Sequence, residues 1–173
     1  MNAFILMIPF FAVRLVLLPV LNRDAASRAS NFAPVYGGEK FAYNIYQLSS
    51  VAIFIYPCFM RAEFDFSWQF WVGTACYILG LILCVASVVA FAHPDGKGLN
   101  TNGVYRFSRN PMYVSYFLYF TGVAALAKSP VLLGLVIMLQ VSTHWIILSE
   151  ERWCIEQFGD DYKSYMQRVR RYI

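Results

Sequence analysis

Charged residues are scarce in this chain. Only 14% of its 173 residues are Asp, Glu, Lys or Arg, whereas a soluble domain carries about 25%. Hydrophobic residues make up 59% of the sequence, and they are gathered into long uncharged runs. This imbalance excludes an ordinary soluble domain, and the length fits a single domain. The net charge of +4 comes from basic residues beside the apolar runs, so it does not indicate a nucleic-acid-binding face.

The chain also lacks the cysteine and histidine patterns of metal sites. Its four cysteines are scattered, and no Cys-x-x-Cys pair or Cys/His cluster occurs. We therefore expect neither a metal site nor a disulfide framework, but reduced thiols that pack as small hydrophobic groups. The first residues, MNAFILMIPF, have no basic segment and no small-residue cleavage site. This favours a first membrane span over a cleavable signal peptide.

Five apolar runs are long enough to be membrane spans, since a helix needs about 20 residues to cross the hydrocarbon core. The sequence predicts an all-α integral membrane protein with one membrane domain, 1–173. Residues 1–92 would hold three spans and a polar loop. Residues 93–173 would hold a second loop, a helical hairpin and a C-terminal helix. The predicted spans are 3–21, 41–60, 68–92, 111–127 and 130–148, and the polar loop is 22–40.

Two short polar stretches predict how the C-terminal part folds. Lys128, Ser129 and Pro130 form a tight turn, with Ser129 as N-cap and Pro130 at the first helical position. Gly159 should end the long last helix, and Asp160 should cap a new one. In that new helix apolar residues recur at three- and four-residue spacing from 162 to 172, with basic residues on the other faces. This pattern is typical of a helix at the membrane surface, or of one packed on a partner protein.

The distribution of basic residues predicts the orientation in the membrane. Five spans place most of the lysines and arginines on one side, and only Arg61 and Lys128 on the other. The positive-inside rule then puts the C-terminus and the 93–110 loop in the cytoplasm, with the protein in an inner or cell membrane. Arg14 falls inside the first span. We expect it to snorkel to the interface or to be paired within the structure.

The polar groups that could form a site gather on that cytoplasmic side. The turn GVYRFSRNPMY, 103–113, is basic, aromatic and conformationally constrained; it is either part of a site or an ordinary positive loop. Glu150 and Glu151 follow the fifth span, and neighbours on a helix are turned by about 100°. We therefore expect one of them to face the loop and Glu151 to lie on a solvated surface. His144 is a candidate catalytic residue, although a hydrogen-bonded core role is more usual.

The sequence TNGVYRFSRNPMY, followed by SEERWCIEQFGDDYKSYMQRVRRYI, resembles a known family. It is similar to the isoprenylcysteine carboxyl methyltransferase and phospholipid methyltransferase superfamily. The signature of that family is close to G-x-Y-x-x-x-R-H-P-x-Y, then a Glu-Glu pair, then F-G-x-x-Y-x-x-Y. The resemblance covers about residues 93–173, whereas the first 90 residues match only in being apolar.

The resemblance implies a membrane-embedded methyltransferase that uses S-adenosylmethionine at the cytoplasmic face. Its acceptor would be lipophilic and enter from the bilayer: a prenylcysteine carboxylate, a lipid or a small apolar molecule. The resemblance implies no metal and no nucleic acid. The residues that match the family's cofactor-binding positions are Lys97, Gly98, Leu99, Asn100, Tyr105, Asn110, Pro111, Met112, Tyr113 and Glu150.

Two positions depart from the family pattern. Asn110 replaces the usual histidine of the signature, and Ile146 stands where the eukaryotic carboxyl methyltransferases have an arginine that holds the substrate. A substrate carboxylate would thus lack its expected cation on this helix. Two alternatives remain. One is an NADPH-dependent membrane reductase of the sterol-reductase type. These reductases have a similar turn, and residues Cys154 to Tyr162 resemble their C-terminal sequence pattern. The other is a non-catalytic membrane protein.

Overall fold

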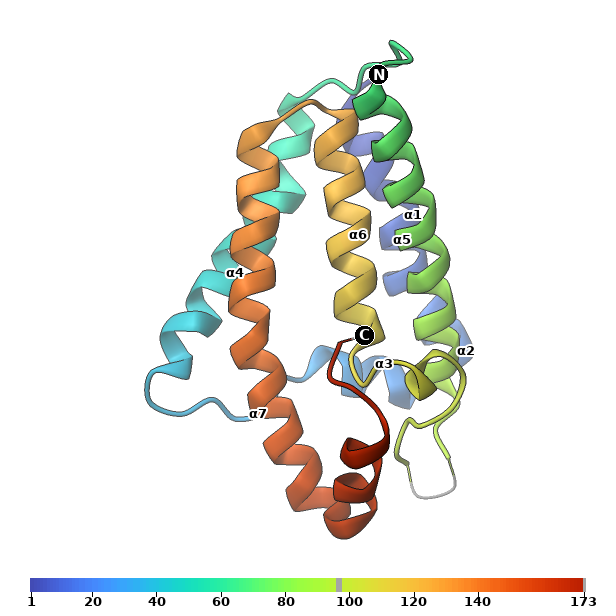
Figure 1. Ribbon diagram of the computed structural model, residues 1–173, viewed down its shortest axis with the longest axis vertical. Helices are drawn as coiled ribbons and strands as arrows, with labels where there is room; N and C mark the ends of the chain where they lie inside the picture. The colour runs from blue at the N-terminus through green and yellow to red at the C-terminus, as the bar shows by residue number, and fades with distance from the viewer. Residues whose placement is uncertain (96–97, 173) are drawn as a thin grey trace.

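A computed structural model describes residues 1–95 and 98–172, and the described chain is helical throughout its regular structure (Figure 1). Three helices are long and apolar enough to cross a membrane: Ala3–Leu21, Trp68–Ala92 and Pro130–Arg168. Pro111–Leu126 is a shorter apolar helix. The chain is therefore an all-helical, multi-pass membrane protein, as the sequence predicts. The number of five spans stays a prediction.

The first predicted span is helical from end to end, but its helical type changes along its length. It runs through η1 (Ala3–Met7), α1 (Ile8–Phe11), the π-helical η2 (Ala12–Leu17) and α2 (Leu18–Leu21). Proline at position 19 has no N–H with which to bond the carbonyl four residues earlier, so the ordinary α-helical register cannot continue there. We refer to residues 3–21 as the N-terminal helix.

The region 22–40, predicted to be a polar loop, contains a helix. α3 (Arg23–Ser30) begins at Asn22, whose side chain accepts hydrogen bonds from the N–H groups of Asp24 and Ala25. An Asn at this position is a strong helix-start signal, and the alanine-rich sequence that follows favours a helix. The loop prediction was therefore wrong for these eight residues. α4 (Glu39–Ile55) and the 3-10 turn η3 (Tyr56–Phe59) then form the second apolar segment.

The closest helix–helix contact joins α5 (Trp68–Ala92) to α6 (Pro111–Leu126). A Cβ atom added at Gly80 would lie 2.4 Å from the backbone nitrogen of Tyr119, and one at Gly122 would lie 2.4 Å from that of Tyr77. Only glycine permits two backbones to approach this closely, as small residues do at membrane-helix interfaces. α5 and α6 therefore form a close-packed pair that positions the loop between them.

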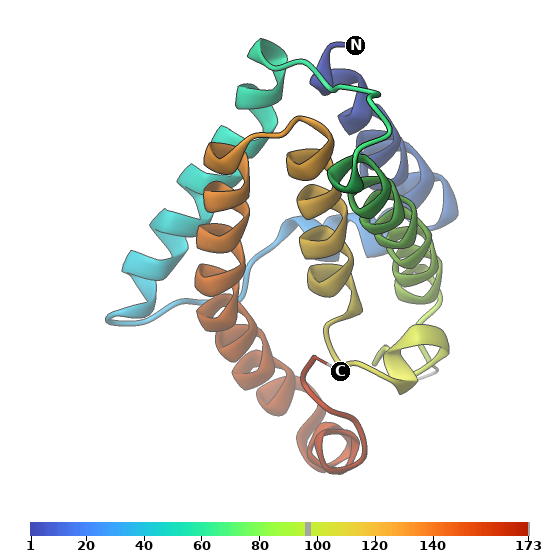
Figure 2. The same ribbon diagram turned by 45° about the horizontal axis from the view of Figure 1, so that its top comes forward.

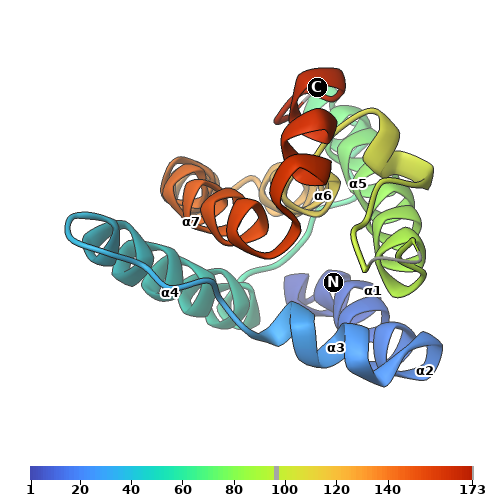
Figure 3. The ribbon, with the colours of Figure 1, turned by 90° about the horizontal axis from the view of Figure 1, so that it is seen from below.

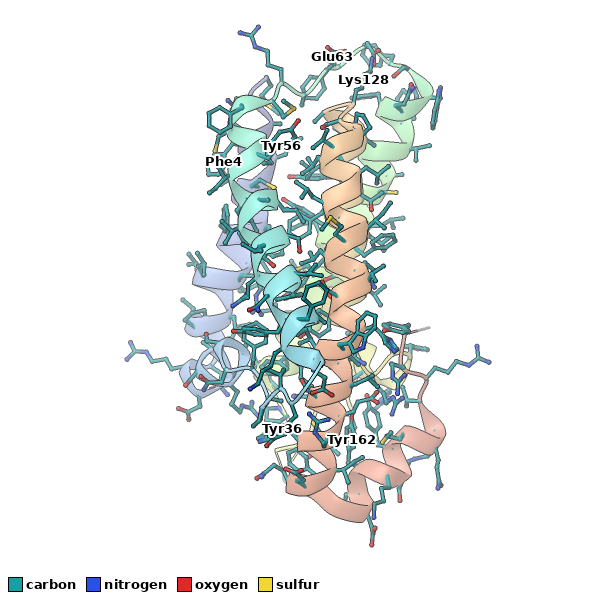
Figure 4. All side chains as sticks on the ribbon, turned by 90° about the vertical axis from the view of Figure 1, so that its left-hand side faces the viewer. Phe4, Tyr36, Tyr56, Glu63, Lys128 and Tyr162 are labelled. Atoms are coloured by element: carbon teal, nitrogen blue, oxygen red, sulfur yellow. The ribbon has the colours of Figure 1, made fainter. Side chains whose placement is uncertain are left out.

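The hairpin of α6 and α7 (Pro130–Arg168) is confirmed. The hydroxyl of Ser129 accepts a hydrogen bond from the N–H of Leu132, and Pro130 occupies the first turn. Lys128 forms ion pairs with Glu63, at 3.1 Å, and with Asp65. The Lys128 ammonium group lowers the pKa of the exposed Asp65 carboxyl to about 2. Figure 4 shows Lys128 and Glu63 at one end of the molecule, with Tyr36 and Tyr162 at the other.

Gly159 turns the chain back at the end of α7. Its φ of 54° and ψ of −126° are not helical, so the predicted stop is confirmed, and a second helical segment folds back toward the bundle (Figure 2). This segment ends at Arg168, and Val169 is extended. The predicted helix up to Tyr172 was therefore too long. We call residues 169–172 the C-terminal strap; hydrogen bonds to other parts of the chain hold it in place.

The apolar side of the segment 160–168 faces the protein itself. Tyr162 and Tyr165 are buried against Leu99, with Cys154 and Phe158 of α7 alongside. These tyrosines are therefore not free to insert into lipid, and the location of the helix at the membrane surface stays a prediction. The four cysteines are all free thiols. Cys84 is buried as expected, whereas Cys58 is exposed, against expectation, because it lies in the short turn η3 at the end of the bundle.

Candidate functional site

Four segments meet at the polar end of the molecule. They are the 93–110 loop with its 3-10 turn η4 (Gly103–Arg106), the start of α6, the second half of α7 and the C-terminal strap. Seen from this end, α7 and α6 lie side by side, with α4 next to α7 and the N-terminal helix on the far side (Figure 3). The chain end lies at the foot of α6 (Figure 1). This convergence places most of the predicted site residues in one region.

Tyr113 and Glu150 form the centre of the candidate site. The Tyr113 hydroxyl donates a hydrogen bond of 2.7 Å to Oε1 of Glu150. Pro111, in the first turn of α6, fixes the start of the helix that carries Tyr113. Among the described residues, no lysine, arginine or histidine forms an ion pair with Glu150. The site therefore holds a half-buried carboxylate with a hydrogen-bond donor beside it and no cation.

Glu151 is also turned inward, contrary to the sequence-based expectation. It is 5% exposed and accepts two hydrogen bonds from Arg171, at 3.0 and 2.8 Å. Nη2 of the buried Arg109 lies 3.1 Å from its Oε1. The expectation of a solvated surface was wrong because Arg109 of the 93–110 loop and Arg171 of the C-terminal strap both cover this side of α7. Hydrogen bonding to Glu151 raises the pKa of Arg171.

The C-terminal strap is held by the turn before α6. The N–H of Arg109 donates to the carbonyl of Arg170 at 3.0 Å, and Nδ2 of Asn110 donates to the carbonyl of Arg171 at 3.0 Å. At the end of the strap, the Tyr172 hydroxyl lies 2.8 Å from Nδ1 of His144. His144 is thus a hydrogen-bonded residue, as the more usual role predicts. The side chain of Asn110, predicted to bind cofactor, already has a partner in this strap.

The other predicted cofactor residues belong to the loop before α6 and to the start of that helix. Gly98 and Leu99 are in the loop, where Leu99 packs against the helical segment 160–168, which we call the terminal helix. Tyr105 is buried, and its carbonyl accepts a 2.6 Å hydrogen bond from the Tyr165 hydroxyl. The Oδ1 atom of Asn100 is buried without a hydrogen-bond partner. Lys97 lies outside the described residues.

A cavity of about 350 Å3 lies between the loop and the terminal helix. Among the predicted cofactor residues that the structure describes, Leu99 alone lines it. Its lining is mainly polar and includes two acids and one arginine. The lining residues are Asp95, Leu99, Thr101, Phe158, Asp161, Ser164, Tyr165 and Arg168.

A second cavity, of about 280 Å3, lies between the N-terminal helix, α4, α6 and α7. We call it the aromatic cavity, since Phe and Tyr side chains form much of its wall. Tyr46 of α4 lines it and also lies within electrostatic range of Glu150 and Tyr113. The full lining is Phe10, Phe11, Arg14, Leu15, Phe32, Tyr46, Gln47, Ser50, Ile53, Phe54, Tyr116, Phe120 and Leu139. The cavity is therefore next to the candidate site.

Sequence reasoning placed no residue of α4 in the site. A signal was nonetheless present, because Tyr46 and Ser50 are four residues apart and so share one face of a helix. Polar side chains on one face of an otherwise apolar span indicate a cavity or a polar contact in the bundle. The Ser50 hydroxyl donates to the backbone carbonyl of Tyr46 at 2.7 Å, so this hydroxyl is bonded within its own helix.

An ion pair ties the start of α4 to α7 near the site. Arg152 donates to both oxygens of Glu39, at 2.9 and 2.8 Å, in the two-pronged geometry that suits a guanidinium group. The hydrogen bond from Arg152 lowers the pKa of Glu39 to about 2. The guanidinium carbon also lies 5.1 Å from the centre of the Tyr36 ring. This contact fixes the polar end of α4 beside Glu150 and Glu151.

Comparison with known proteins places this geometry in a family. Residues 68–161, more than half of the chain, match the family model described as phospholipid methyltransferase. The chain belongs to this family. It is also 29% identical over 135 residues to a protein-S-isoprenylcysteine O-methyltransferase of Dictyostelium discoideum, with 62% of this chain and 54% of the relative covered. The chain thus spans about half the length of this curated relative.

The family match divides the site into two parts. It begins at the start of α5 and ends in the terminal helix, so it includes Tyr113 and Glu150. The N-terminal helix and α4 lie before it, and these elements contribute Arg14 and Tyr46 to the aromatic cavity. The part that family members share thus carries the Tyr113–Glu150 pair, whereas one wall of the cavity lies outside it.

Proposed function

We propose that this protein is a methyltransferase that uses S-adenosylmethionine and acts at the cytoplasmic membrane face on a lipophilic acceptor. The observation that carries this proposal is the Tyr113–Glu150 pair in a chain of the phospholipid methyltransferase family. Glu150 is a carboxylate that forms no ion pair with the described residues, and it lies next to a cavity that extends between the apolar helices. A cationic methyl donor would complete this arrangement.

The residues of the site fit the polar groups of S-adenosylmethionine. The donor carries two positive groups, a sulfonium and an ammonium, and a carboxylate and ribose hydroxyls. Glu150 and the unpartnered Oδ1 of Asn100 are acceptors suited to its positive or donor groups. The free N–H groups in the first turn of α6 suit its carboxylate, and the ring of Tyr113 can contact the sulfonium.

The main task of the protein is to hold two reactants in place and to exclude water. When bound, S-adenosylmethionine supplies a methyl group that its sulfonium already activates. Glu150 and Tyr113 would orient the donor, and the terminal helix with the C-terminal strap closes the polar end over it. Positioning of this kind accounts for much of the rate enhancement in such reactions. A carboxylate acceptor needs no general base, so no role for His144 is required.

The acceptor would enter from the bilayer through the aromatic cavity. Leu15 and Phe32, at the edge of the cavity, are exposed, which is expected where a cavity opens toward lipid. The basic asymmetry of the loops supports a cytoplasmic C-terminus. A prenylated cysteine, a lipid or a small apolar molecule would each have its hydrocarbon part between helices and its polar end at Glu150 and Tyr113.

Labelled S-adenosylmethionine incubated with the purified protein and a membrane extract tests the proposal. We expect label in the organic phase, and a loss of about tenfold or more when Glu150→Gln removes a charged hydrogen-bond acceptor. Glu156→Gln, the same change at an exposed glutamate of α7, is the control and should transfer normally. Label confined to water-soluble products would contradict lateral entry. No transfer, together with binding of NADPH, would favour a reductase.

A further inference from the structure

Arg14 is a cation placed in the wall of the aromatic cavity. It lies in the π-helical turn η2 of the N-terminal helix and lines the cavity together with Tyr46 and Tyr116. π-helical turns inside longer helices are frequent at functional sites. An ionisable residue within an apolar span also tends to mark a binding site. Both features coincide at this one residue.

The contacts of Arg14 within the protein are weak. Nη1 lies 3.6 Å from the sulfur of Met112, and Nη2 lies 3.5 Å from the carbonyl oxygen of Ala29. The guanidinium carbon is 5.8 Å from the centre of the Tyr116 ring. Among the residues that the structure describes, no carboxylate forms an ion pair with it. The sequence predicts that Arg14 is paired within the structure or snorkels to the interface. The contacts observed for it are these weak ones with neutral groups.

Other partly buried arginines of the protein are each bound to a carboxylate. Arg109 and Arg171 share Glu151, and Arg152 holds Glu39. A partly buried guanidinium group without an anion is costly, because its lost hydration is not replaced. Arg14 thus has the capacity to bind an anion that the chain does not itself provide.

We propose that Arg14 binds the carboxylate of the methyl acceptor, and that the acceptor is a lipophilic carboxylate with its hydrocarbon part in the aromatic cavity. This inference rests on the proposed function. The planar fork of guanidinium donors matches the two oxygens of a carboxylate, and the aromatic wall matches a hydrocarbon chain. The cavity volume of about 280 Å3 is close to the lower end of the range of ligand sites, roughly 300–1,000 Å3.

The position of Arg14 relative to Glu150 suits a carboxylate acceptor. Tyr46 lies within electrostatic range of both residues, and Met112 contacts Arg14 from the turn of helix that also carries Tyr113. An acceptor held at Arg14 therefore has its anionic end on the side of the cavity that faces the proposed donor. The α7 position expected to carry the substrate-binding cation is Ile146, which is 1% exposed and apolar. Arg14 supplies a cation from a different helix.

The test is a binding measurement without any methyl donor. The probes are N-acetyl-S-farnesylcysteine and its methyl ester, titrated into purified protein in lipid nanodiscs. The wild type should bind the acid about tenfold or more tightly than the ester, since a charge-assisted hydrogen-bond pair is lost in the ester. Arg14→Gln should remove this preference, and Arg14→Lys should keep part of it. Arg23→Gln, an exposed arginine on α3, should bind like the wild type.

Equal affinity for acid and ester in the wild type would overturn the proposal, and this comparison needs no variant to fold. Retention of the full preference in Arg14→Gln, with an unchanged melting temperature, would also overturn it. Oleate and methyl oleate form a second arm: a stronger Arg14-dependent preference there would identify a fatty-acyl rather than a prenylcysteine source of the carboxylate. Methyl transfer that continues while the acid shows no preference would refute the role of Arg14 and leave the proposed function intact.

Discussion

The contact between α5 and α6 and the space between the N-terminal helix and α4 are built in opposite ways. At Gly80 and Gly122 two backbones meet with no room for a Cβ atom. On the other side of α6, large aromatic side chains line a cavity of about 280 Å3. The close contact lies within the part that matches the family, and the N-terminal helix and α4 lie outside it. A close-packed pair of helices thus carries Tyr113, and the proposed acceptor side lies where the helices leave a cavity between them.

The two regions also differ in whether their arginine side chains are paired with carboxylates. Arg109 and Arg171, near the foot of α6, are both bound to Glu151. Among the described residues, the guanidinium group of Arg14 in the cavity wall has a sulfur atom, a carbonyl oxygen and an aromatic ring as its polar contacts. Charges that hold the fold together are paired inside the chain. The unpaired cation is in the region proposed to receive the acceptor.

The largest expected effect is that of a bulky residue in the close contact. Gly80→Leu would force a side chain into the backbone of Tyr119, where even a Cβ atom would be only 2.4 Å away. Overpacking of this kind costs about 3 kcal/mol or more. We therefore expect little folded protein, as measured by monodisperse yield on gel filtration in detergent.

The matched control for this substitution is Gly134→Leu on α7. A Cβ atom at Gly134 would meet nothing within 4 Å, so the same change in volume should be tolerated. Similar yields for the two variants would contradict the close packing of α5 on α6.

The second expected effect concerns the carboxylate that links α7, the turn before α6 and the C-terminal strap. Glu151→Ala would leave Arg109 buried without its partner and release Arg171 from the strap. Loss of one partner from a buried ion pair costs about 3–5 kcal/mol. Thermal unfolding should therefore show a large decrease in melting temperature. Glu156→Ala removes an exposed glutamate of the same helix and should leave the melting temperature within experimental error; an equal decrease in both variants would argue against the buried network.

A third, smaller effect depends on pH and tests the attachment of α4. The pKa of Glu39 in the folded protein is about 2, below its ordinary value, so Glu39 stabilises the fold at pH values above about 4.5. This stabilisation is lost as the pH falls from about 4.5 toward 2. The pair is partly exposed, so its contribution is at most about 1 kcal/mol. Glu39→Gln should reduce the acid-induced decrease in melting temperature over this range. The same decrease in the variant as in the wild type would contradict the pairing with Arg152.

The smallest effect is expected for a larger side chain in the aromatic cavity. Ser50 lines the cavity, and its hydroxyl bonds only to the carbonyl of its own helix at Tyr46. Ser50→Met should change the melting temperature little, because the cavity has room for the added atoms. It should nevertheless weaken binding of the lipophilic acid. A melting temperature as low as that of Gly80→Leu would show that the cavity is not open in the folded protein.

Much of the fold follows from local signals in the sequence. The turn at Ser129 and Pro130 and the stop at Gly159 were predicted correctly, because capping residues and positive φ angles act over a few neighbouring residues. The helix α3 was missed, since a polar composition was taken for a loop although Asn22 is a good N-cap. A single sequence thus indicates where helices begin and end better than it indicates short helices on a membrane surface.

The candidate site was predictable only in part. Tyr113 and Glu150 were proposed from the resemblance, and the structure brings them into hydrogen-bond contact. The inward position of Glu151 was not foreseen, because it depends on a strap that returns from residues 169–172. Arg14 and Tyr46 are far from the signature in sequence and meet it only through helix packing. The polar face formed by Tyr46 and Ser50 indicates a polar contact within the bundle, but no local pattern identifies the partner that helix packing brings to it.

The measurement that tests the central claim most directly is titration calorimetry of S-adenosylmethionine and of NADPH against the purified protein. The Tyr113–Glu150 pair predicts binding of S-adenosylmethionine to the wild type and affinities about tenfold or more weaker for Glu150→Gln and Tyr113→Phe. It predicts no binding of NADPH. Equal affinity for S-adenosylmethionine in the wild type and in Glu150→Gln, or binding of NADPH in its place, would contradict the assignment of this pair to a methyl donor.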